Sequence, residues 1–405
     1  MMLNQCNKRG RLLLVSISFL VLIFQTGCWS TDEIEDLGLF VGMALDVANQ
    51  TEIEKKMDRL VSSYRKKDLI TFTLQIIDKQ SEGKDANSGG GTTAKPYINV
   101  SETGDSLFEM VREYSARMER PVIGHHLKLI VINEKLSRLY SMNNLLNFVL
   151  RDNDLRPNCL IVMSSGLARK VFDTKGNSVI PAFRVINMVE NRYRTLKILP
   201  PMSIIKVEGK MNAKSSYLLQ NVVATDGEVK FSGASVIKGK TQKFRGRLSE
   251  DELLGVMWLS GKGKGGLVKS YDEKTKQVIA YEIKTMKSKM KSQIKNGKIS
   301  FHVHIESEGR LIEEWVVANE PTDNELNSKA LQSTEKEVRR LVNIGLRKIQ
   351  KDYKTDVVGF GKRLSIEHPK QWQKVKDDWD DEFSRIPITY SIKLTITDTG
   401  AKQEH

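Results

Sequence analysis

The sequence predicts an α/β protein with α+β character in its last third, built from mixed β-sheets and packed helices. Apolar runs typical of buried strands alternate with segments of helical periodicity in the first half of the chain. Near the end, a run with two-residue alternation precedes a long helix and a second alternating run. A chain of 405 residues also exceeds the usual size of one hydrophobic core, so we expect more than one domain.

The first 28 residues have the parts of a lipoprotein signal peptide. Three cations within residues 8–11 are followed by the largely apolar run Leu12–Phe24 and then by Gln25-Thr26-Gly27-Cys28. The apolar run is shorter than the roughly 20 residues that a membrane-spanning helix needs. The small residues before Cys28 allow cleavage between Gly27 and Cys28, after which the thiol can accept a diacylglyceryl group. We therefore predict lipid attachment at Cys28.

Gln25 departs from the usual lipobox, which has an aliphatic residue three positions before the cysteine. An uncleaved N-terminal membrane helix is the alternative interpretation, and the short apolar run favours the lipobox. Two acyl chains of the palmitate kind give durable attachment, whereas a single chain binds a membrane only reversibly. We expect a body that is tethered to the outer face of a membrane.

The first half of the mature chain alternates strands and helices. Residues 34–46 and Leu69–Ile77 have the composition of buried strands and could pair as neighbours. The polar, glycine-rich stretch Ser81–Ala94 predicts a surface loop. We then expect a helix over Ser101–Arg117, a strand over Leu127–Ile132, a helix over Leu136–Leu150 and a strand over Asn158–Met163.

Pro200-Pro201 interrupts this pattern and predicts a domain junction near residues 200–207. Short strands are expected after it, at Ile204–Val207, Leu218–Ala224 and Val229–Ile237. Ser249–Trp258 opens like a capped helix, with Ser249 as the cap and Glu252 in the capping-box position.

The last third has the clearest periodicities. Ile299–Glu306 alternates as a half-buried strand does, and Asn324–Lys351 carries the apolar stripe of a long helix. Helical spacing from Trp372 to Phe383 and alternation over Ile388–Ile396 predict a further helix and a terminal strand. The expected organisation is a signal peptide at 1–27, an N-terminal α/β domain at 28–205, a small middle domain at 206–268 and an α+β domain at 269–405.

Composition supports an exported body. Cleavage would leave 378 residues, in which no later stretch is apolar enough to span a bilayer. With Cys6 removed and Cys28 lipidated, Cys159 is the cysteine that remains, so we expect no intramolecular disulfide. The net charge of +14 becomes +11 without the three signal-peptide cations. That charge suits an anionic membrane surface, and nucleic acid is an implausible partner for a tethered, exported protein.

No catalytic or metal-binding motif stands out. His302 and His304 share one face of a strand at a spacing that can hold a metal, but beyond Glu306 no further ligand completes the set. We prefer a solvated polar face. The adjacent His125 and His126 would point to opposite faces of a strand and make a poor ligand pair. We therefore expect no enzymatic activity, no cofactor and no metal.

Two charged segments have ordinary interpretations. Gly261–Gly266 includes Lys262 and Lys264 and could present N–H groups to a phosphate, but it lacks the spacing and hydroxyl residue of a P-loop. We interpret it as a flexible turn, with contact to a lipid headgroup as the alternative. The carboxylates within Asp377–Asp381 surround Trp379, and we interpret them as a solvated helix face.

Several segments together resemble the Ger(x)C lipoproteins, the C subunits of nutrient germinant receptors in endospore-forming bacteria. The resemblance is carried by Gly27-Cys28-Trp29 with Glu33–Leu37, Gly124–Val131, Arg151–Pro157, Leu254–Lys262, Gly359-Phe360-Gly361, His368-Pro369, Trp372, Trp379 and Phe383. These segments cover nearly the whole mature chain in order, and the terminal aromatic pattern is the most specific. We interpret that pattern as a folding signature with one packed aromatic face. The doubled histidine at 125–126 and the extra residues around Thr51–Lys67 depart slightly from the family.

The resemblance implies a three-domain lipoprotein on the inner spore membrane, assembled with an A subunit and an integral-membrane B subunit. It also implies that the protein is required for nutrients such as amino acids or sugars to trigger germination. No cluster of Arg, Asp and aromatic residues marks a nutrient pocket in the sequence, so we expect an interaction module with ligand recognition largely elsewhere. A solute-binding lipoprotein of a membrane transporter is the alternative, although this chain shows no internal repeat.

Overall fold

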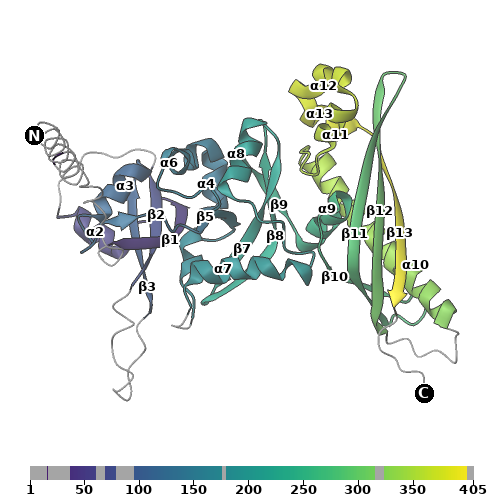
Figure 1. The fold of residues 1–405 in the computed structure, drawn as a ribbon, viewed down its shortest axis with the longest axis horizontal. Coiled ribbons are helices and arrows are strands. Elements are labelled where there is room, and N and C mark those ends of the chain that lie inside the picture. Colours follow the sequence, from purple (N-terminus) through teal and green to yellow (C-terminus); the bar gives the residue numbers. More distant parts are fainter. Residues whose placement is uncertain are drawn as a thin grey trace, which may run out of the picture.

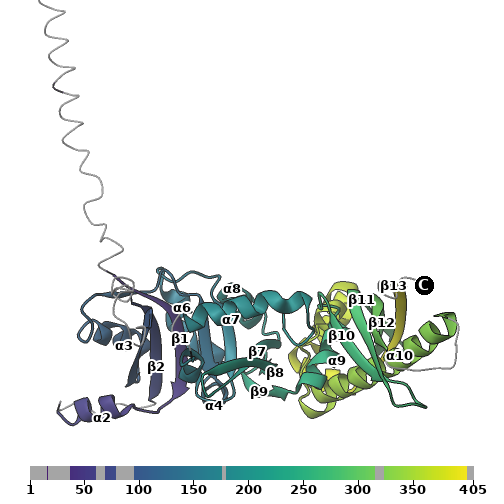
Figure 2. The same ribbon diagram turned by 90° about the horizontal axis from the view of Figure 1, so that it is seen from below.

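The computed structural model describes residue 16 and residues 37–60, 69–78, 95–175, 179–314 and 323–398. Their strands form two sheets at opposite ends of an elongated molecule, with α9 (Glu250–Ser260) between them (Figures 1 and 2). Two mixed sheets covered by packed helices confirm the predicted fold class. Cys28, the signal peptide and the loop expected at Ser81–Ala94 lie outside the described residues.

Within the described residues, the first sheet has the order β3-β2-β1-β5-β6-β7-β8-β9, and β4 pairs with β1. Its strands are β1 (Gly38–Val47), β2 (Ile70–Ile77), β3 (Tyr97–Gly104), β4 (Val122–Ile123), β5 (Leu129–Asn133), β6 (Leu160–Ser164), β7 (Tyr217–Thr225), β8 (Glu228–Lys238) and β9 (Lys243–Leu248). The accompanying helices are α2 (Glu52–Asp58), α3 (Leu107–Tyr114), α4 (Glu134–Leu139), α5 (Met142–Leu145), α6 (Asn147–Arg151), α7 (Pro181–Glu190), α8 (Ile204–Asn212) and the 3₁₀ helices η3 (Ala168–Phe172) and η4 (Asn191–Tyr193).

The centre of this sheet is parallel and buried on both faces. Strands β1, β5, β6 and β7 run parallel, and antiparallel strands flank them. Ile130 and Ile132 of β5 pack into a core with α3, α4 and α8, whereas Leu129 and Val131 pack into the opposite core with α7 and η3. Because both faces are covered, β5 reads as a continuous apolar run.

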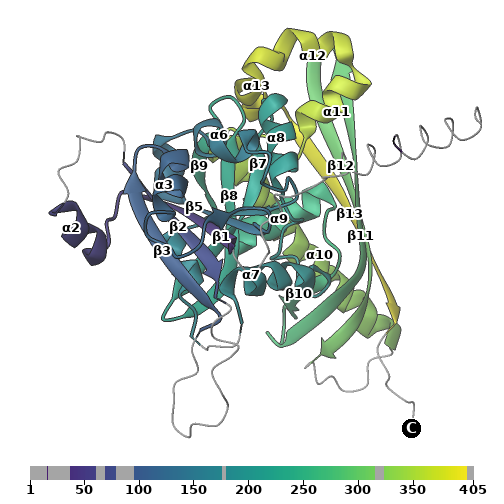
Figure 3. The same ribbon diagram turned by 60° about the vertical axis from the view of Figure 1, so that its left-hand side comes forward.

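The second sheet has the order β10-β11-β12-β13. Its strands are β10 (Gly266–Tyr271), β11 (Val278–Lys295), β12 (Lys298–Glu314) and β13 (Ile388–Asp398), and its helices are α10 (Asp323–Arg347), the π-helix η5 (Lys348–Asp352), α11 (Phe360–Glu367), α12 (Pro369–Val375), the 3₁₀ helix η6 (Lys376–Asp378) and α13 (Trp379–Arg385). Helices α11–α13 gather near the β11–β12 turn (Figure 3). One core joins this sheet to α9, whose Trp258 is fully buried, and to Val236 and Leu248 of the first sheet.

Four of the expected elements were wrong in whole or in part, and one of them, the helix expected from Trp372 to Phe383, is divided into α12, η6 and α13. Ile204–Val207 is the start of α8 and not a strand, because Ile204, Val207 and Met211 are buried at helical spacing. The single helix expected at Leu136–Leu150 is three short helices. Tyr140 is extended after α4, and the Ser141 side chain caps α5 by accepting the N–H of Asn144.

The helix expected at Ser101–Arg117 begins later, since Ser101 belongs to β3 and pairs there with Thr73. Ser106 caps α3 by accepting the N–H of Glu109, so the helix proper starts at Leu107. The capping box at Ser249 and Glu252 is confirmed. Both hydrogen bonds of the box are present.

Gly261–Gly266 is a packed turn rather than a flexible one. Gly261 ends α9 with a φ of 62°, and a Cβ there would lie 2.6 Å from the backbone nitrogen of Ser288. A Cβ at Gly263 would collide with the side chain of Leu196. The glycines are therefore needed because neighbouring chain passes close to the turn.

The expected middle domain does not have a sheet of its own. Strands β7, β8 and β9 extend the first sheet, whereas α9 packs into the core of the second. The domain boundaries at residues 205 and 268 stay a prediction. Hydrogen exchange followed segment by segment would show whether the parts on either side of each boundary unfold separately.

Candidate functional site

An open groove of about 740 Å³ lies between the start of α3, the helices α5 and α6, and the loop that follows α6. Its volume falls in the range of ligand and peptide sites in proteins. The lining residues come from three separated segments, 105–112, 140–148 and 151–154, together with Ile70. The last of these segments begins the Arg151–Pro157 stretch noted in the sequence. The fold brings the start of this stretch to the same groove as the start of α3.

Aromatic side chains form an apolar part of the groove. The ring centroids of Phe108 and Phe148 are 5.9 Å apart, in a tilted arrangement. Phe108 exposes 52% of its surface although it is large and apolar. The Arg112 guanidinium lies 4.9 Å from the centroid of the Phe108 ring, at cation–π distance. An exposed aromatic ring that packs on a half-buried one is typical of a surface that a partner covers.

Charged side chains of both signs line the same groove. Arg112 and Arg151 make no ion pair among the described residues. Asp152 accepts the backbone N–H of Asp154, and the Asp154 carboxylate lies 3.6 Å from Nε2 of His125. The two guanidinium groups are therefore the charges left available for an anionic group from outside.

The segments around Gly124 and Leu155, both part of the resemblance noted in the sequence, pack closely together. A Cβ at Gly124 would collide with the side chains of Leu155 and Phe40. Only glycine allows this approach, because Leu155 and Phe40 are both buried. His125 and His126, just before the strand expected at Leu127–Ile132, lie in the turn after Gly124. Burial and neighbouring cations lower the pKa of His126.

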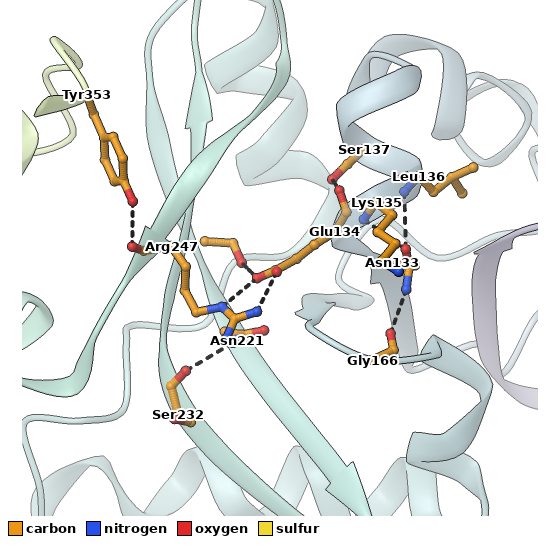
Figure 4. A network of polar contacts seen from close by, with 11 residues as sticks. Asn133, Glu134, Lys135, Leu136, Ser137, Gly166, Asn221, Ser232, Arg247 and Tyr353 are labelled. Atoms are coloured by element: carbon orange, nitrogen blue, oxygen red, sulfur yellow. Dashed lines mark hydrogen bonds and ion pairs between the residues drawn. The ribbon is translucent and has the colours of Figure 1, made fainter.

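A second network joins the first sheet to Tyr353, the residue that follows η5 (Figure 4). Asn133 ends β5, accepts the N–H of Lys135 to cap α4, and donates its amide to the carbonyl of Gly166. Glu134 accepts hydrogen bonds from Ser235 at 2.9 Å and from the guanidinium of Arg247 at 2.7 and 3.1 Å. Hydrogen bonding to Glu134 raises the pKa of the Arg247 guanidinium.

The network continues into the C-terminal part of the chain. The Tyr353 hydroxyl donates to the carbonyl of Arg247 at 2.7 Å, and Arg245 donates back to the carbonyl of Tyr353 at 3.2 Å. A Cβ at Gly246 would collide with the Tyr353 ring. The Tyr353 ring therefore packs directly against β9. Together these contacts hold α4, β9 and the end of η5 in one arrangement.

The terminal aromatic pattern is structural. Asp356 accepts the N–H groups of Gly359 and Gly361 at 2.7 Å and the indole N–H of Trp379 at 3.0 Å. Phe360 and Phe383 are fully buried beside them. Gly361 is required because a Cβ would lie 2.7 Å from the Trp379 nitrogen. Through these contacts, the residues of the pattern hold the start of α11 against α13.

The two histidines of β12 contact hydroxyl and carboxylate groups. His302 contacts the hydroxyls of Thr389 and Ser391, and His304 contacts Ser391 and Glu306. Among the residues that the structure describes, no group of three or more His, Cys, Asp or Glu could hold a metal. Asp380 pairs with Lys238 at 3.3 Å.

Cys159 is a buried free thiol whose pKa is raised by burial. In the described part of the chain, no helix is both long and apolar enough to cross a bilayer.

The sequence did not reveal the groove or the Glu134–Arg247 pair. Both assemble from residues that are far apart in the chain, and Glu134 and Arg247 are 113 positions apart. The polar stretch Arg151–Pro157 was the available signal for the groove.

Comparison with known proteins gives consistent results over the whole length. The family described as "Spore germination protein N-terminal domain" matches residues 30–223, and "Spore germination B3/GerAC like, C-terminal" matches residues 232–400. Spore germination protein YndF of Bacillus subtilis is 44% identical over 94% of this chain and 95% of its own length. Spore germination protein B3 of the same organism is 32% identical over 95% of this chain and 97% of its own.

A solved structure agrees with the sequence comparison. The crystal structure of the GerBC protein superimposes with a TM-score of 0.59 and 28% identity, covering 83% of this chain and 99% of that one. The resemblance inferred from the sequence motifs is thereby confirmed. The chain belongs to the Ger(x)C family of spore germination proteins.

Proposed function

We propose that this protein is the lipid-anchored, non-enzymatic subunit of a nutrient germinant receptor, required for nutrient-triggered germination through contact with membrane-embedded A and B subunits. Family membership supports a role in spore germination. The lipobox ending at Cys28 supports an anchor in the inner spore membrane, with the body on its outer face. No cofactor is needed for this role.

Tethering explains how weak contacts can suffice. A diacylglyceryl anchor at Cys28 keeps the body beside a membrane subunit, so the second contact forms at high effective concentration. Nine residues separate Cys28 from Gly38, where β1 begins. The anchor therefore limits the body to a short distance from the bilayer, because an extended chain spans at most about 3.5 Å per residue.

The groove is the observation that best supports contact with a partner subunit. It combines an apolar anchor, the exposed Phe108 in contact with Phe148, with Arg112 and Arg151, which make no ion pair within the described part of the chain. Aromatic and arginine residues are enriched among those that dominate protein–protein binding. We assign this groove the contact with a membrane subunit.

The test is affinity capture of the full-length lipidated chain from spore membranes. Phe108→Ala and Arg151→Gln should each reduce recovery of the A and B subunits and slow nutrient-triggered germination. Ile205→Ala is the matched control, since Ile205 is 57% exposed but lies on α8, outside the groove. Equal recovery with all three variants would contradict the role of the groove, and no A or B subunit recovered with the unaltered chain would contradict the proposal itself.

Solute binding is a second candidate function, and the groove is also what favours it. Arg112, Arg151 and Asp152 converge beside aromatic rings, which is the kind of cluster that the sequence did not mark. Calorimetry with amino acids and sugars separates the two functions. One-to-one binding at micromolar affinity that Arg151→Gln abolishes would support a solute-binding protein, whereas no heat of binding supports an interaction module.

A further inference from the structure

The second sheet has one covered face and one open face. Ile299, Phe301 and Val303 of β12 are buried in the core that α9, α10 and α11 share with this sheet. The residues between them, Ser300 and His302, belong to the opposite face. Figure 3 shows the sheet along one side of the molecule, with α9 and α11 on the side that faces the first sheet. In the part of the chain that the structure describes, the face opposite this core, called the outer face below, is open.

Lysines gather on the outer face along the β11–β12 hairpin. The register shifts of β11 end at Thr285, so alternate residues from there to the turn lie on one face. The pairing of β11 with β12 and of β12 with β13 then places the residues opposite them on the same face. Two carboxylates, Glu306 and Glu308, share this stretch with six exposed lysines, which are Lys287, Lys289, Lys291, Lys295, Lys298 and Lys393.

Two of these lysines lie opposite histidines. Lys289 pairs with His304 across the hairpin, and Lys291 pairs with His302. Each histidine ring contacts the Ser391 hydroxyl on the next strand, at 2.7 Å for His304 and 3.0 Å for His302. A carboxylate at either position would stabilise the sheet by forming a pair of opposite charge. The residues directly opposite these two ammonium groups therefore supply no negative charge.

The ends of the row are also short of negative charge. Lys295 and Lys298 lie directly opposite each other beside the turn, and like charges in that arrangement destabilise a hairpin. Lys287 lies opposite Glu306, whose carboxylate contacts Nε2 of His304 at 2.9 Å. None of the six lysines makes an ion pair within the described residues. The outer face thus carries a surplus of positive charge that the chain itself does not neutralise.

The other side chains of this stretch indicate what the charge is for. They are hydroxyl, amide and imidazole groups, and they belong to Gln293, Ser300, His302, His304, Thr389, Ser391 and Thr395. Aliphatic and aromatic residues, which are typical of the centre of a protein–protein interface, are absent from this described stretch, and lysine is depleted in such interfaces. An anionic bilayer surface attracts clustered lysines and needs no apolar contact. The chemistry of the outer face therefore favours lipid headgroups over a protein.

We propose that the outer face of the second sheet binds the anionic headgroups of the bilayer through this row of lysines. The proposal rests on the proposed function in one respect, because the anchor at Cys28 is what keeps the body beside a bilayer. Exposed charges act over about 8 Å at physiological ionic strength, so the face lies directly against the headgroups. The anchor then sets how far the body can move from the membrane, and the lysines set which side of the body faces it.

The experiment places the full-length lipidated chain on two kinds of vesicle. One kind is phosphatidylcholine alone, and the other is phosphatidylcholine with an equal amount of phosphatidylglycerol. An acetylating reagent is added, and mass spectrometry measures how fast each lysine reacts. Lys287, Lys289 and Lys291 should react about fivefold more slowly on the mixed vesicles, because anionic headgroups cover them. A high-salt buffer should abolish the difference, since it screens exposed charges.

Lys135 is the matched reference, because it is exposed but lies on α4 beside the first sheet. Its rate of acetylation should be the same on both kinds of vesicle. A variant that combines Lys289→Gln with Lys291→Gln removes two central charges at exposed positions, so the protection of Lys287 should be largely lost. Lys135→Gln removes the same kind of charge elsewhere and should leave the protection of Lys287 unchanged.

The outcomes separate the lysine face from the anchor. A chain that is recovered with both kinds of vesicle, and whose lysines react equally fast on both, would overturn the proposal and support the anchor. A chain recovered with the mixed vesicles alone, with Lys289 and Lys291 protected, would support the lysine face and contradict the anchor. Recovery with neither kind would contradict both. Protection that appears in spore membranes but not on the mixed vesicles would overturn the assignment to lipid, in favour of an acidic protein surface.

Discussion

The guanidinium of Arg247 holds the carboxylate of Glu134 with two hydrogen bonds, of 2.7 and 3.1 Å. Glu134 is buried at the start of α4, whereas the Arg247 side chain on β9 keeps 43% of its surface exposed. The carbonyl of the same arginine accepts the Tyr353 hydroxyl. One residue thus connects the parallel core of the first sheet to the segment that leads into α11.

Substitution of the two partners should have unequal effects. Arg247→Met leaves a buried carboxylate with Ser235 as its remaining side-chain donor, so we expect a loss of about 2 kcal/mol in the free energy of unfolding. Glu134→Gln keeps an acceptor for Ser235 and leaves the arginine in water, so the expected loss is about 1 kcal/mol.

Urea denaturation of both variants and of the double variant measures the pair. The double variant should lose less than the sum of the two, because it no longer contains an unpaired charge. Additive losses, or a larger loss for Glu134→Gln, would show that the pair does not connect the two elements as described.

Trp379 should stabilise the C-terminal part in two separable ways. Its ring packs against Trp372, Phe301 and Phe383 at centroid distances of 5.3, 6.4 and 6.2 Å, and its N–H donates to Asp356. Trp379→Ala removes both contributions and should cost about 3 kcal/mol, the lower end for a large aromatic because Trp379 is half-buried.

Trp379→Phe isolates the hydrogen bond. It keeps most of the packing and should cost about 1–2 kcal/mol, since the Asp356 carboxylate loses one of its three donors. Trp372→Phe is the control and should cost less. An unchanged denaturation midpoint for Trp379→Ala would instead make the aromatic face a candidate surface for a partner.

The parts of the fold that the sequence predicted well are those set by local pattern. The capping box at Ser249 and Glu252 and the alternation of Ile299–Glu306 needed no tertiary information, and both are confirmed. The strand predicted at Ile204–Val207 was wrong because four residues of apolar character fit a strand as well as a helix. The buried Met211, which decides for the helix, comes one turn later.

The site was harder to predict because it depends on contacts between distant segments. Phe108 and Phe148 are each unremarkable in sequence, and they meet only when α3 and α6 pack beside one another. The composition of Gly261–Gly266 predicts a flexible turn, but composition cannot show that Ser288 and Leu196 pass close to the glycines. Composition predicts flexibility only where no other part of the chain packs against the glycines.

The lowered pKa of Lys210 should appear as a stability effect with a defined pH dependence. The pKa of Lys210 in the folded protein lies below its ordinary value of 10.5, because of burial and then Lys362. Its charge therefore destabilises the folded state fully at pH 7, and this penalty disappears as the pH rises from the folded pKa toward 10.5.

Lys210→Met keeps the side-chain length and removes the charge. We expect it to raise the free energy of unfolding at pH 7, by at most about 1 kcal/mol because the group is partly solvated. The gain should shrink when unfolding is measured near pH 10. A loss of stability at pH 7, or a gain that grows with pH, would contradict a lowered pKa of Lys210 in the folded protein.

The lipid anchor is predicted at Cys28, which lies outside the described residues. Cys28→Ala removes the thiol that the diacylglyceryl group would join, so we expect an unprocessed precursor that begins at Met1. The unaltered chain should yield a mature N-terminus at a diacylglyceryl-cysteine. Mass spectrometry of the membrane fraction distinguishes the two, and an intact Met1 on the unaltered chain would contradict lipidation.

Two further variants make this test specific. Cys6→Ala is the matched control, because Cys6 lies in the segment that is removed and its loss should leave processing unchanged. Gln25→Leu restores the aliphatic residue that is usual three positions before the cysteine, so it should speed the appearance of the mature form in a pulse-chase experiment. Since two acyl chains give durable attachment, the processed chain should stay with the membrane after a high-salt wash. A processed chain that the wash releases would mean that charge, rather than lipid, holds the body to the bilayer.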